Sequence, residues 1–66
     1  MIILYGNHCP KCNVLEKKLL QSNIKFVYCD NMAYMQKRGF DFMPVLEVNG
    51  RVMNFAEAVK WLNERK

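Results

Sequence analysis

The stretch IILYGNHCPKC, residues 2–12, decides how this chain of 66 residues folds. Residues 2–6 form a short apolar run that is closed by glycine and asparagine, which indicates a buried strand rather than a helix of ten or more residues. Residues 10–21 repeat apolar side chains at helical spacing, which predicts an amphipathic helix. Its inward positions are Cys12, Leu15 and Leu19. Cys9 therefore stands where the strand ends and the helix begins.

The next elements extend this beginning into a parallel unit. Residues 24–29 alternate large apolar residues with others and are rich in strand formers, which predicts a second strand. Strand, helix and strand within about thirty residues form a right-handed parallel βαβ unit. Asn31 is a good helix cap and Gly39 is a typical left-handed terminator, so we expect a short helix over 31–38.

The last third of the chain predicts a hairpin and a closing helix. Two strands, 44–48 and 51–53, flank Asn49-Gly50, the strongest short signal for a hairpin turn. Asn54 and Glu57 form the pattern of a capping box, which starts the final helix. We therefore expect one α/β domain over 1–66, in the order βαβ-α-ββα, with a four-stranded mixed sheet.

Side chains expected in the core come from several elements. The aromatic and leucine positions expected there are Phe26, Phe55, Trp61 and Leu62, and the methionines expected to fill gaps are Met32, Met35 and Met53. Phe40 and Phe42, beside Pro44, either line a substrate groove or simply pack.

Charge and cysteine content narrow the function classes. The net charge of +4 comes from scattered lysines and arginines, with no basic run and no nucleic-acid motif, so we expect no nucleic-acid partner. The first apolar run is too short for a secretion signal or a membrane span, which favours a cytoplasmic monomer that binds no membrane. Three cysteines in such a chain favour cysteine chemistry over structural disulfides.

The pair Cys9-Pro10-Lys11-Cys12 carries that chemistry. Proline is favoured at the first helical position, which makes Cys9 the N-cap residue. We expect its sulfur to accept hydrogen bonds from the N–H groups of Lys11 or Cys12, and the helix dipole and the Lys11 ammonium to favour the thiolate. Cys12, three residues on, lies within reach of a disulfide. We therefore expect Cys9 to attack a substrate disulfide and Cys12 to resolve the mixed disulfide.

Other interpretations of the cysteines stay open. Cys9 and Cys12 with His8 and Cys29 could supply four zinc ligands, although adjacent His8 and Cys9 cannot easily reach one tetrahedral ion. Cys29 fits a small buried hydrophobic residue better than a third redox thiol, although the parallel strands bring it to the same sheet edge. His8 either tunes Cys9 or fills the loop, and we favour the loop.

In this order, these residues resemble the glutaredoxin branch of the thioredoxin superfamily over essentially the whole chain. The specific parts are the strand leading into Cys9-Pro10-Lys11-Cys12, the stretch 39–45, and the Asn49-Gly50 hairpin. The resemblance implies a thioredoxin-like fold, a thiol–disulfide oxidoreductase that reduces protein or glutathione mixed disulfides, and no bound cofactor. It also implies a cis Met43–Pro44 bond that faces Cys9. This bond turns the Met43 backbone outward, so that a substrate peptide can pair with it.

The chain departs from the family's pattern where glutathione usually binds. The family's Gly-Gly pair and acidic residue are replaced by residues 53–57, and Lys11 stands where many members carry tyrosine. We still expect the N–H groups of Asn54, Phe55 and Ala56 to form an anion site at the helix start, helped by Lys37 or Arg38. The residues expected to contact substrate are Lys11, Met43, Pro44, Asn54 and Phe55.

Three functions compete on this basis. The first is a dithiol oxidoreductase for a disulfide-containing protein, with glutathione as a possible co-substrate. The second is an electron donor dedicated to one enzyme, such as ribonucleotide reductase, which thioredoxin reductase recharges and to which the positive charge guides docking. The third is a metal-binding or iron–sulfur module.

Overall fold

The sheet is built around its first strand. In the computed structural model, which describes residues 1–65, β1 (Ile2–Tyr5) pairs in parallel with β2 (Val27–Cys29) and antiparallel with β3 (Val45–Val48). β4 (Arg51–Met53) completes the sheet beside β3, which gives the order β2-β1-β3-β4. The sheet is therefore mixed and four-stranded, as the sequence predicts.

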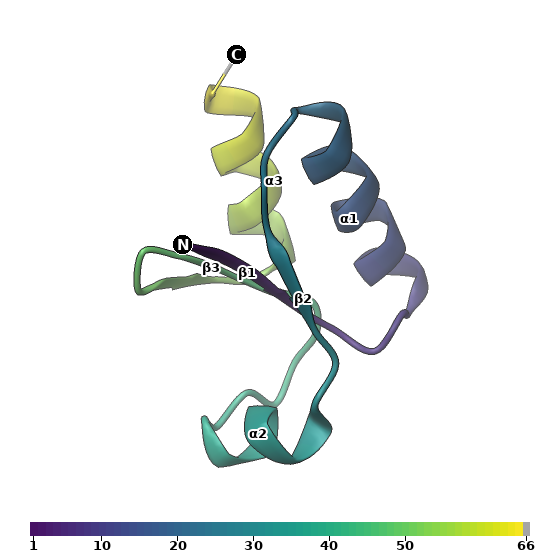
Figure 1. The fold of residues 1–66 in the computed structure, drawn as a ribbon, viewed down its shortest axis with the longest axis vertical. Coiled ribbons are helices and arrows are strands. Elements are labelled where there is room, and N and C mark those ends of the chain that lie inside the picture. Colours follow the sequence, from purple (N-terminus) through teal and green to yellow (C-terminus); the bar gives the residue numbers. More distant parts are fainter. Residues whose placement is uncertain (66) are drawn as a thin grey trace.

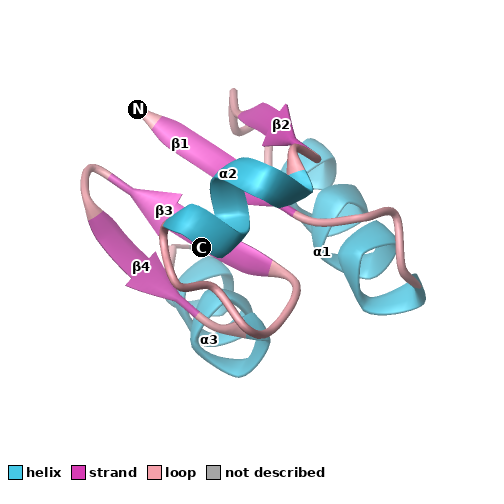
Figure 2. Cartoon of the chain, turned by 90° about the horizontal axis from the view of Figure 1, so that it is seen from below, coloured by secondary structure: helices cyan, strands magenta, loops and turns pink. Residues whose placement is uncertain are grey.

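The helices lie on both faces of the sheet. α1 (Pro10–Gln21) and α3 (Phe55–Glu64) cover one face, and α2 (Met32–Lys37) lies across the other (Figures 1 and 2). This arrangement follows from the βαβ unit, in which the crossover helix packs back onto the sheet between two parallel strands. The element order βαβαββα in this single domain resembles a thioredoxin-like fold and confirms the predicted fold class.

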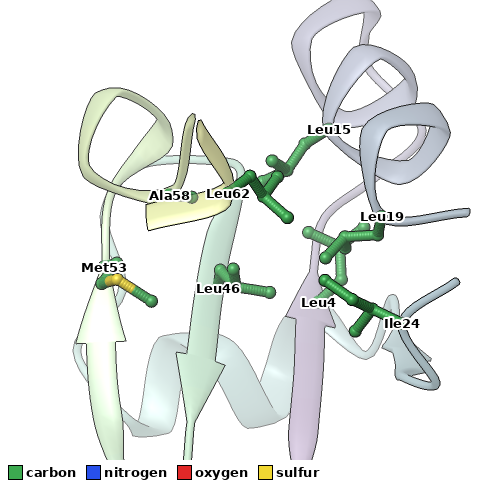
Figure 3. Packing of buried hydrophobic residues seen from close by; sticks show 8 residues of the cluster. All are labelled: Leu4, Leu15, Leu19, Ile24, Leu46, Met53, Ala58 and Leu62. Atoms are coloured by element: carbon green, nitrogen blue, oxygen red, sulfur yellow. The ribbon is translucent and has the colours of Figure 1, made fainter. Parts of the chain in front are cut away.

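The main core lies between the sheet and the pair α1 and α3 (Figure 3). Its buried members are Leu4, Leu15, Leu19, Ile24, Leu46, Met53, Ala58 and Leu62. Leu62 and Met53 are buried as predicted, whereas Phe26, Phe55 and Trp61 are only half-buried and pack against the margin of this cluster. Large aromatic side chains at the margin shield a small core that has no room to enclose them.

A second, smaller cluster lies on the α2 face. It consists of Tyr5, Met35 and Val45, because alternate residues of a strand point to opposite faces. Met35 is fully buried, as the sequence predicts for a gap-filling methionine. The same prediction is wrong for Met32, because its position in the first turn of α2 leaves it 41% exposed.

Arg38 ties α2 to the sheet. Its Nη1 donates to Glu47 Oε1 at 3.1 Å, to the Tyr34 hydroxyl at 3.2 Å and to the Tyr5 hydroxyl at 3.3 Å. The guanidinium also lies 4.9 Å from the centroid of the Phe40 ring, within the range of a cation–π contact. A helix of only six residues gains most of its fixed position from contacts of this kind.

Element ends differ from the prediction mainly at the second strand. The ladder starts at Val27 instead of residue 24. Ile24 is buried in the core, and its N–H donates to the Leu19 carbonyl, so it completes the turn that ends α1. The predicted turn residues hold: Gly39, Asn49 and Gly50 have φ values of 81°, 49° and 91°.

Among the helices of residues 1–65, none combines the length and the apolar character that a membrane-crossing segment needs.

Candidate functional site

Cys9 is the N-cap residue of α1. Its backbone is extended, with φ −70° and ψ 166°, and Pro10 follows at the first helical position. Its Sγ accepts a hydrogen bond from the Cys12 backbone N–H at 3.2 Å. The Cys9 side chain is only half-buried, so the sulfur satisfies a free helix N–H and still meets solvent. This confirms the predicted position of Cys9 and, of the two donors predicted as alternatives, shows the Cys12 N–H.

Cys12 lies inside the protein, one turn further along α1. Its side chain is fully buried, on the same helix face as Leu15 and Leu19. Its Sγ lies 3.8 Å from the Asn7 side-chain oxygen, an alternative to the Cys9 sulfur as acceptor of its single S–H proton. Gly6 makes room for this sulfur, because a Cβ on Gly6 would stand only 2.8 Å from it. The two cysteines therefore lie together at one helix start, both reduced, one facing out and the other enclosed.

The two thiols differ in acidity. A hydrogen bond from the Cys12 side chain lowers the pKa of Cys9 most, the N–H groups of Cys12 and Lys11 lower it further, and partial burial acts against them. Burial is the main cause that raises the pKa of Cys12, and its hydrogen bond to Cys9 raises it further. Cys9 is therefore the more acidic thiol of the pair and ionises before Cys12.

The Lys11 side chain lies over the Phe55 ring. Its ammonium is 5.8 Å from the centroid of that ring, and the Lys11 backbone N–H is among the hydrogen bonds that lower the pKa of Cys9. The expectation that the ammonium itself stabilises the thiolate stays a prediction. The long lysine side chain turns to the aromatic face, where a cation is favoured.

A groove opens beside Cys9, between α2 and the loop that precedes β3. Its volume is about 660 Å³, and most of its surface is apolar. Its lining residues are Asn7, Cys9, Met32, Gln36, Gly39, Phe40, Asp41, Phe42 and Met43. The half-exposed Cys9 therefore forms part of the wall of this groove. Phe40 and Phe42, for which the sequence left groove and packing open, both line it, and Phe40 also packs on Tyr5.

A second groove, of about 350 Å³, lies between the start of α1 and the start of α3. It brings together every residue predicted to contact substrate: Lys11, Met43, Pro44, Asn54 and Phe55. Phe42 and Met43 line both grooves and separate them. The Met43–Pro44 peptide bond is cis, as the resemblance implies, and Met43 lies just outside the ladder, which begins at Val45.

The start of α3 offers fewer free amides than expected. The Asn54 N–H donates to Glu57 Oε1 at 3.1 Å, and Glu57 N–H donates to Asn54 Oδ1 at 2.8 Å. This predicted capping box already uses one of the three N–H groups expected to bind an anion, which leaves those of Phe55 and Ala56. Arg38, expected to help at this site, forms an ion pair with Glu47 and does not line the groove. The positively charged residue that lines it is Lys11.

His8 and Cys29 lie to either side of the pair without joining it. The His8 ring stacks on Tyr28 with centroids 4.7 Å apart, and its Nε2 lies 3.5 Å from Asp30. Cys29 packs half-buried against the Tyr5 cluster, on the α2 face of the sheet. Within residues 1–65, no three His, Cys, Asp or Glu side chains gather in a way that could hold a metal ion.

Three site residues were missed by the sequence analysis: Gly6, Asn7 and Tyr28. Asn7 and Gly6 contact the Cys12 sulfur, and the Tyr28 hydroxyl accepts the His8 N–H at 3.0 Å. A signal existed for Tyr28, because the alternation of the second strand places it on the face of Leu4, next to the end of β1.

Fold and site together define a small α/β domain, thioredoxin-like in fold, with a cysteine pair at the N-terminus of its first helix. Comparison with protein-family models, with curated protein sequences and with solved structures finds no match to this chain.

Proposed function

We propose that the protein is a thiol–disulfide oxidoreductase of glutaredoxin-like type, with Cys9 as nucleophile and Cys12 as resolving thiol. The observation that carries this proposal is the asymmetry of the pair. Cys9 is half-exposed at a groove with its pKa lowered, and Cys12 is buried behind it with its pKa raised. A nucleophile needs access and charge, whereas a resolving thiol needs only to reach the sulfur of its partner.

The reaction conserves electrons at each step. The Cys9 thiolate attacks one sulfur of a substrate disulfide, which forms a mixed disulfide and releases the other sulfur as a thiolate. Cys12 then loses its proton to solvent or to that leaving thiolate and attacks the Cys9 sulfur. This closes the Cys9–Cys12 disulfide and releases the second substrate thiol, so the substrate gains two electrons and the protein loses two.

The two grooves fit the parts of such a substrate. An apolar side chain next to the substrate cysteine fits the groove beside Cys9, which Phe40, Phe42 and Met43 line. A carboxylate fits the second groove, next to Lys11 and the free N–H groups at the start of α3. A mixed disulfide between a protein and glutathione carries both groups, with apolar side chains on the protein and carboxylates on the glutathione. We therefore propose protein disulfides as substrates, with glutathione as a co-substrate, in the reducing cytoplasm.

Single-cysteine variants test the proposal on a model disulfide. Cys9→Ser is expected to abolish reduction, and Cys12→Ser to form a mixed disulfide and stop there, which mass spectrometry detects. Cys29→Ser is the matched control and is expected to keep the rate, because Cys29 packs on the other face of the sheet. A Cys9→Ser variant that reduced the disulfide at the normal rate would refute the proposal.

The reductant is identified in a separate experiment. The net charge of +4 suits docking to an acidic enzyme, as a dedicated electron donor to ribonucleotide reductase would require. The oxidised protein is mixed either with glutathione or with thioredoxin reductase and NADPH, and the rate of dithiol recovery is measured. Recovery with glutathione supports the glutaredoxin-like function. Recovery with the reductase alone supports the dedicated donor.

A further inference from the structure

Tyr28 connects the second strand to the loop that carries Cys9. Its hydroxyl oxygen accepts the backbone N–H of His8 at 3.0 Å, one residue before the nucleophile. Its ring stacks on the His8 imidazole, with centroids 4.7 Å apart and planes within 6°. His8 has a φ of 62°, in the left-handed region that residues other than glycine seldom adopt. The contacts with Tyr28 therefore hold a backbone conformation that the loop would not prefer by itself.

The same hydroxyl lies close to the buried thiol. A Cβ added to Gly6 would stand 2.9 Å from the Tyr28 hydroxyl and 2.8 Å from the Cys12 sulfur. The Tyr28 hydroxyl and the Cys12 sulfur therefore both pack against the Cα of Gly6, on the side where any other residue would carry its Cβ. Tyr28, on β2, thus contacts both the backbone of His8, which precedes Cys9, and the Gly6 position that packs on the Cys12 sulfur.

We propose that Tyr28 is a positioning residue of the cysteine pair: its hydroxyl fixes the loop at residues 6–8 and thereby holds the Cys9 sulfur at the cap of α1, beside Cys12. This inference rests on the proposed function only in assigning the pair a reaction. The Cys9 sulfur is stabilised as an anion by N–H and thiol donors at the helix start, and such bonds weaken steeply as the acceptor moves away. A looser loop therefore raises the pKa of Cys9.

The hydroxyl also has a proton to give. It accepts the His8 N–H through its oxygen, which leaves its own hydrogen for a nearby acceptor. Burial raises the pKa of Tyr28 most, the hydrogen bond from the His8 N–H lowers it, and negative charge on Cys12, Glu16 and Cys9 raises it further. The phenol therefore stays protonated near neutral pH.

The test compares Tyr28→Phe with the unaltered chain. This variant keeps the stacked ring and removes one oxygen, so circular dichroism is expected to show the same fold. The Cys9 thiolate is titrated by its ultraviolet absorbance and by the pH dependence of its alkylation. We expect the titration midpoint of Cys9 to rise by at most about one pH unit, because the loosened loop weakens a hydrogen bond to the Cys9 sulfur without removing it.

Tyr34→Phe is the matched control. Its hydroxyl contacts Arg38 on the α2 face, so removing it is expected to leave the Cys9 midpoint unchanged. A folded Tyr28→Phe variant with the Cys9 midpoint of the unaltered chain would overturn the inference. The titration needs no substrate, so a chain that reduces no disulfide but shows the shift would disprove the proposed function and retain this role of Tyr28.

A second measurement needs no variant. Oxidation of Cys9 and Cys12 to a disulfide removes both sulfur charges, so the pKa of Tyr28 is expected to fall relative to the reduced protein. NMR of the tyrosine ring carbons follows each hydroxyl separately, with Tyr34 as internal control. Equal Tyr28 titrations in the two redox states would contradict the placement of its hydroxyl beside the sulfurs.

Discussion

Replacing Cys12 tests how the Cys9 thiolate is stabilised. The largest cause that lowers the pKa of Cys9 is the hydrogen bond from the Cys12 side chain, and the Cys12 backbone N–H adds a second bond at 3.2 Å. Cys12→Ala removes the first and keeps the second. A hydrogen bond to a charged group contributes about 1.5–3 kcal/mol, and a thiol is a weak donor, so the lower end applies. The Cys9 midpoint is therefore expected to rise by about one pH unit.

Cys12→Ser separates the hydrogen bond from the sulfur. Its hydroxyl can donate as the thiol does, so the Cys9 midpoint is expected to stay low, whereas Cys12→Ala raises it. The assay is the alkylation rate of Cys9 against pH, followed by mass spectrometry of its peptide so that Cys29 does not interfere. Equal midpoints in Cys12→Ala and in the unaltered chain would refute the assignment of the neighbouring thiol as the main cause.

The lowered pKa of Cys9 also links its ionisation to folding. The thiolate is more stable in the folded chain than in the unfolded chain, where the pKa of a cysteine is about 8.5. The stability it contributes is therefore fully present above the unfolded pKa and is lost as pH falls through the folded pKa. The raised pKa of Cys12 has the opposite sign: its contribution is present below the unfolded pKa and is lost as pH rises through the folded one.

Three further predictions concern stability, each measured by urea denaturation. Gly6→Ala places a Cβ 2.8 Å from the Cys12 sulfur and is expected to lower the free energy of unfolding by about 1–3 kcal/mol. Gly39→Ala is the control, because its Cβ meets open space and only the φ of 81° opposes it. An unchanged urea midpoint for Gly6→Ala would contradict the close packing. Tyr5→Phe removes a hydroxyl that bonds to Arg38 and Glu47 and is expected to cost about 1–2 kcal/mol, more than Tyr34→Phe at an exposed site. Asn54→Ala breaks the capping box of α3 and is expected to cost about 1 kcal/mol, and an equal stability would show that the box contributes nothing.

Much of the site could be predicted because it depends on local sequence. The N-cap position of Cys9 follows from Pro10 next to it, and the burial of Cys12 follows from its spacing to Leu15 and Leu19. The hairpin at Asn49 follows from the preference of Asn-Gly for positive φ. Each of these features is settled within a few residues of the chain, so no tertiary contact was needed to find it.

The contacts that escaped prediction join distant parts of the chain. Tyr28 reaches the Cys9 loop across 20 residues, and this contact depends on the register that pairs Leu4 with Tyr28. The attachment of Arg38 to Glu47 depends on where α2 lies over the sheet, which no local pattern encodes. That the Asn54 N–H is not free to bind an anion could have been predicted, because the predicted capping box already assigns it to the Glu57 side chain.

The proposed order of attack within the pair follows from helix geometry. A residue at the N-cap lies outside the helix and faces solvent, whereas a residue three positions later returns to the inward face that Leu15 and Leu19 define. Hydrogen bonds from the Cys12 side chain and from free amides lower the pKa of Cys9, and burial raises that of Cys12. The same apolar periodicity that makes α1 a helix therefore separates the two thiols in access and in acidity. In the proposed function, one helix start supplies both the nucleophile and the resolving thiol, and Tyr28 and Gly6 both contact that start: Tyr28 through the His8 N–H and Gly6 through the space it leaves for the Cys12 sulfur.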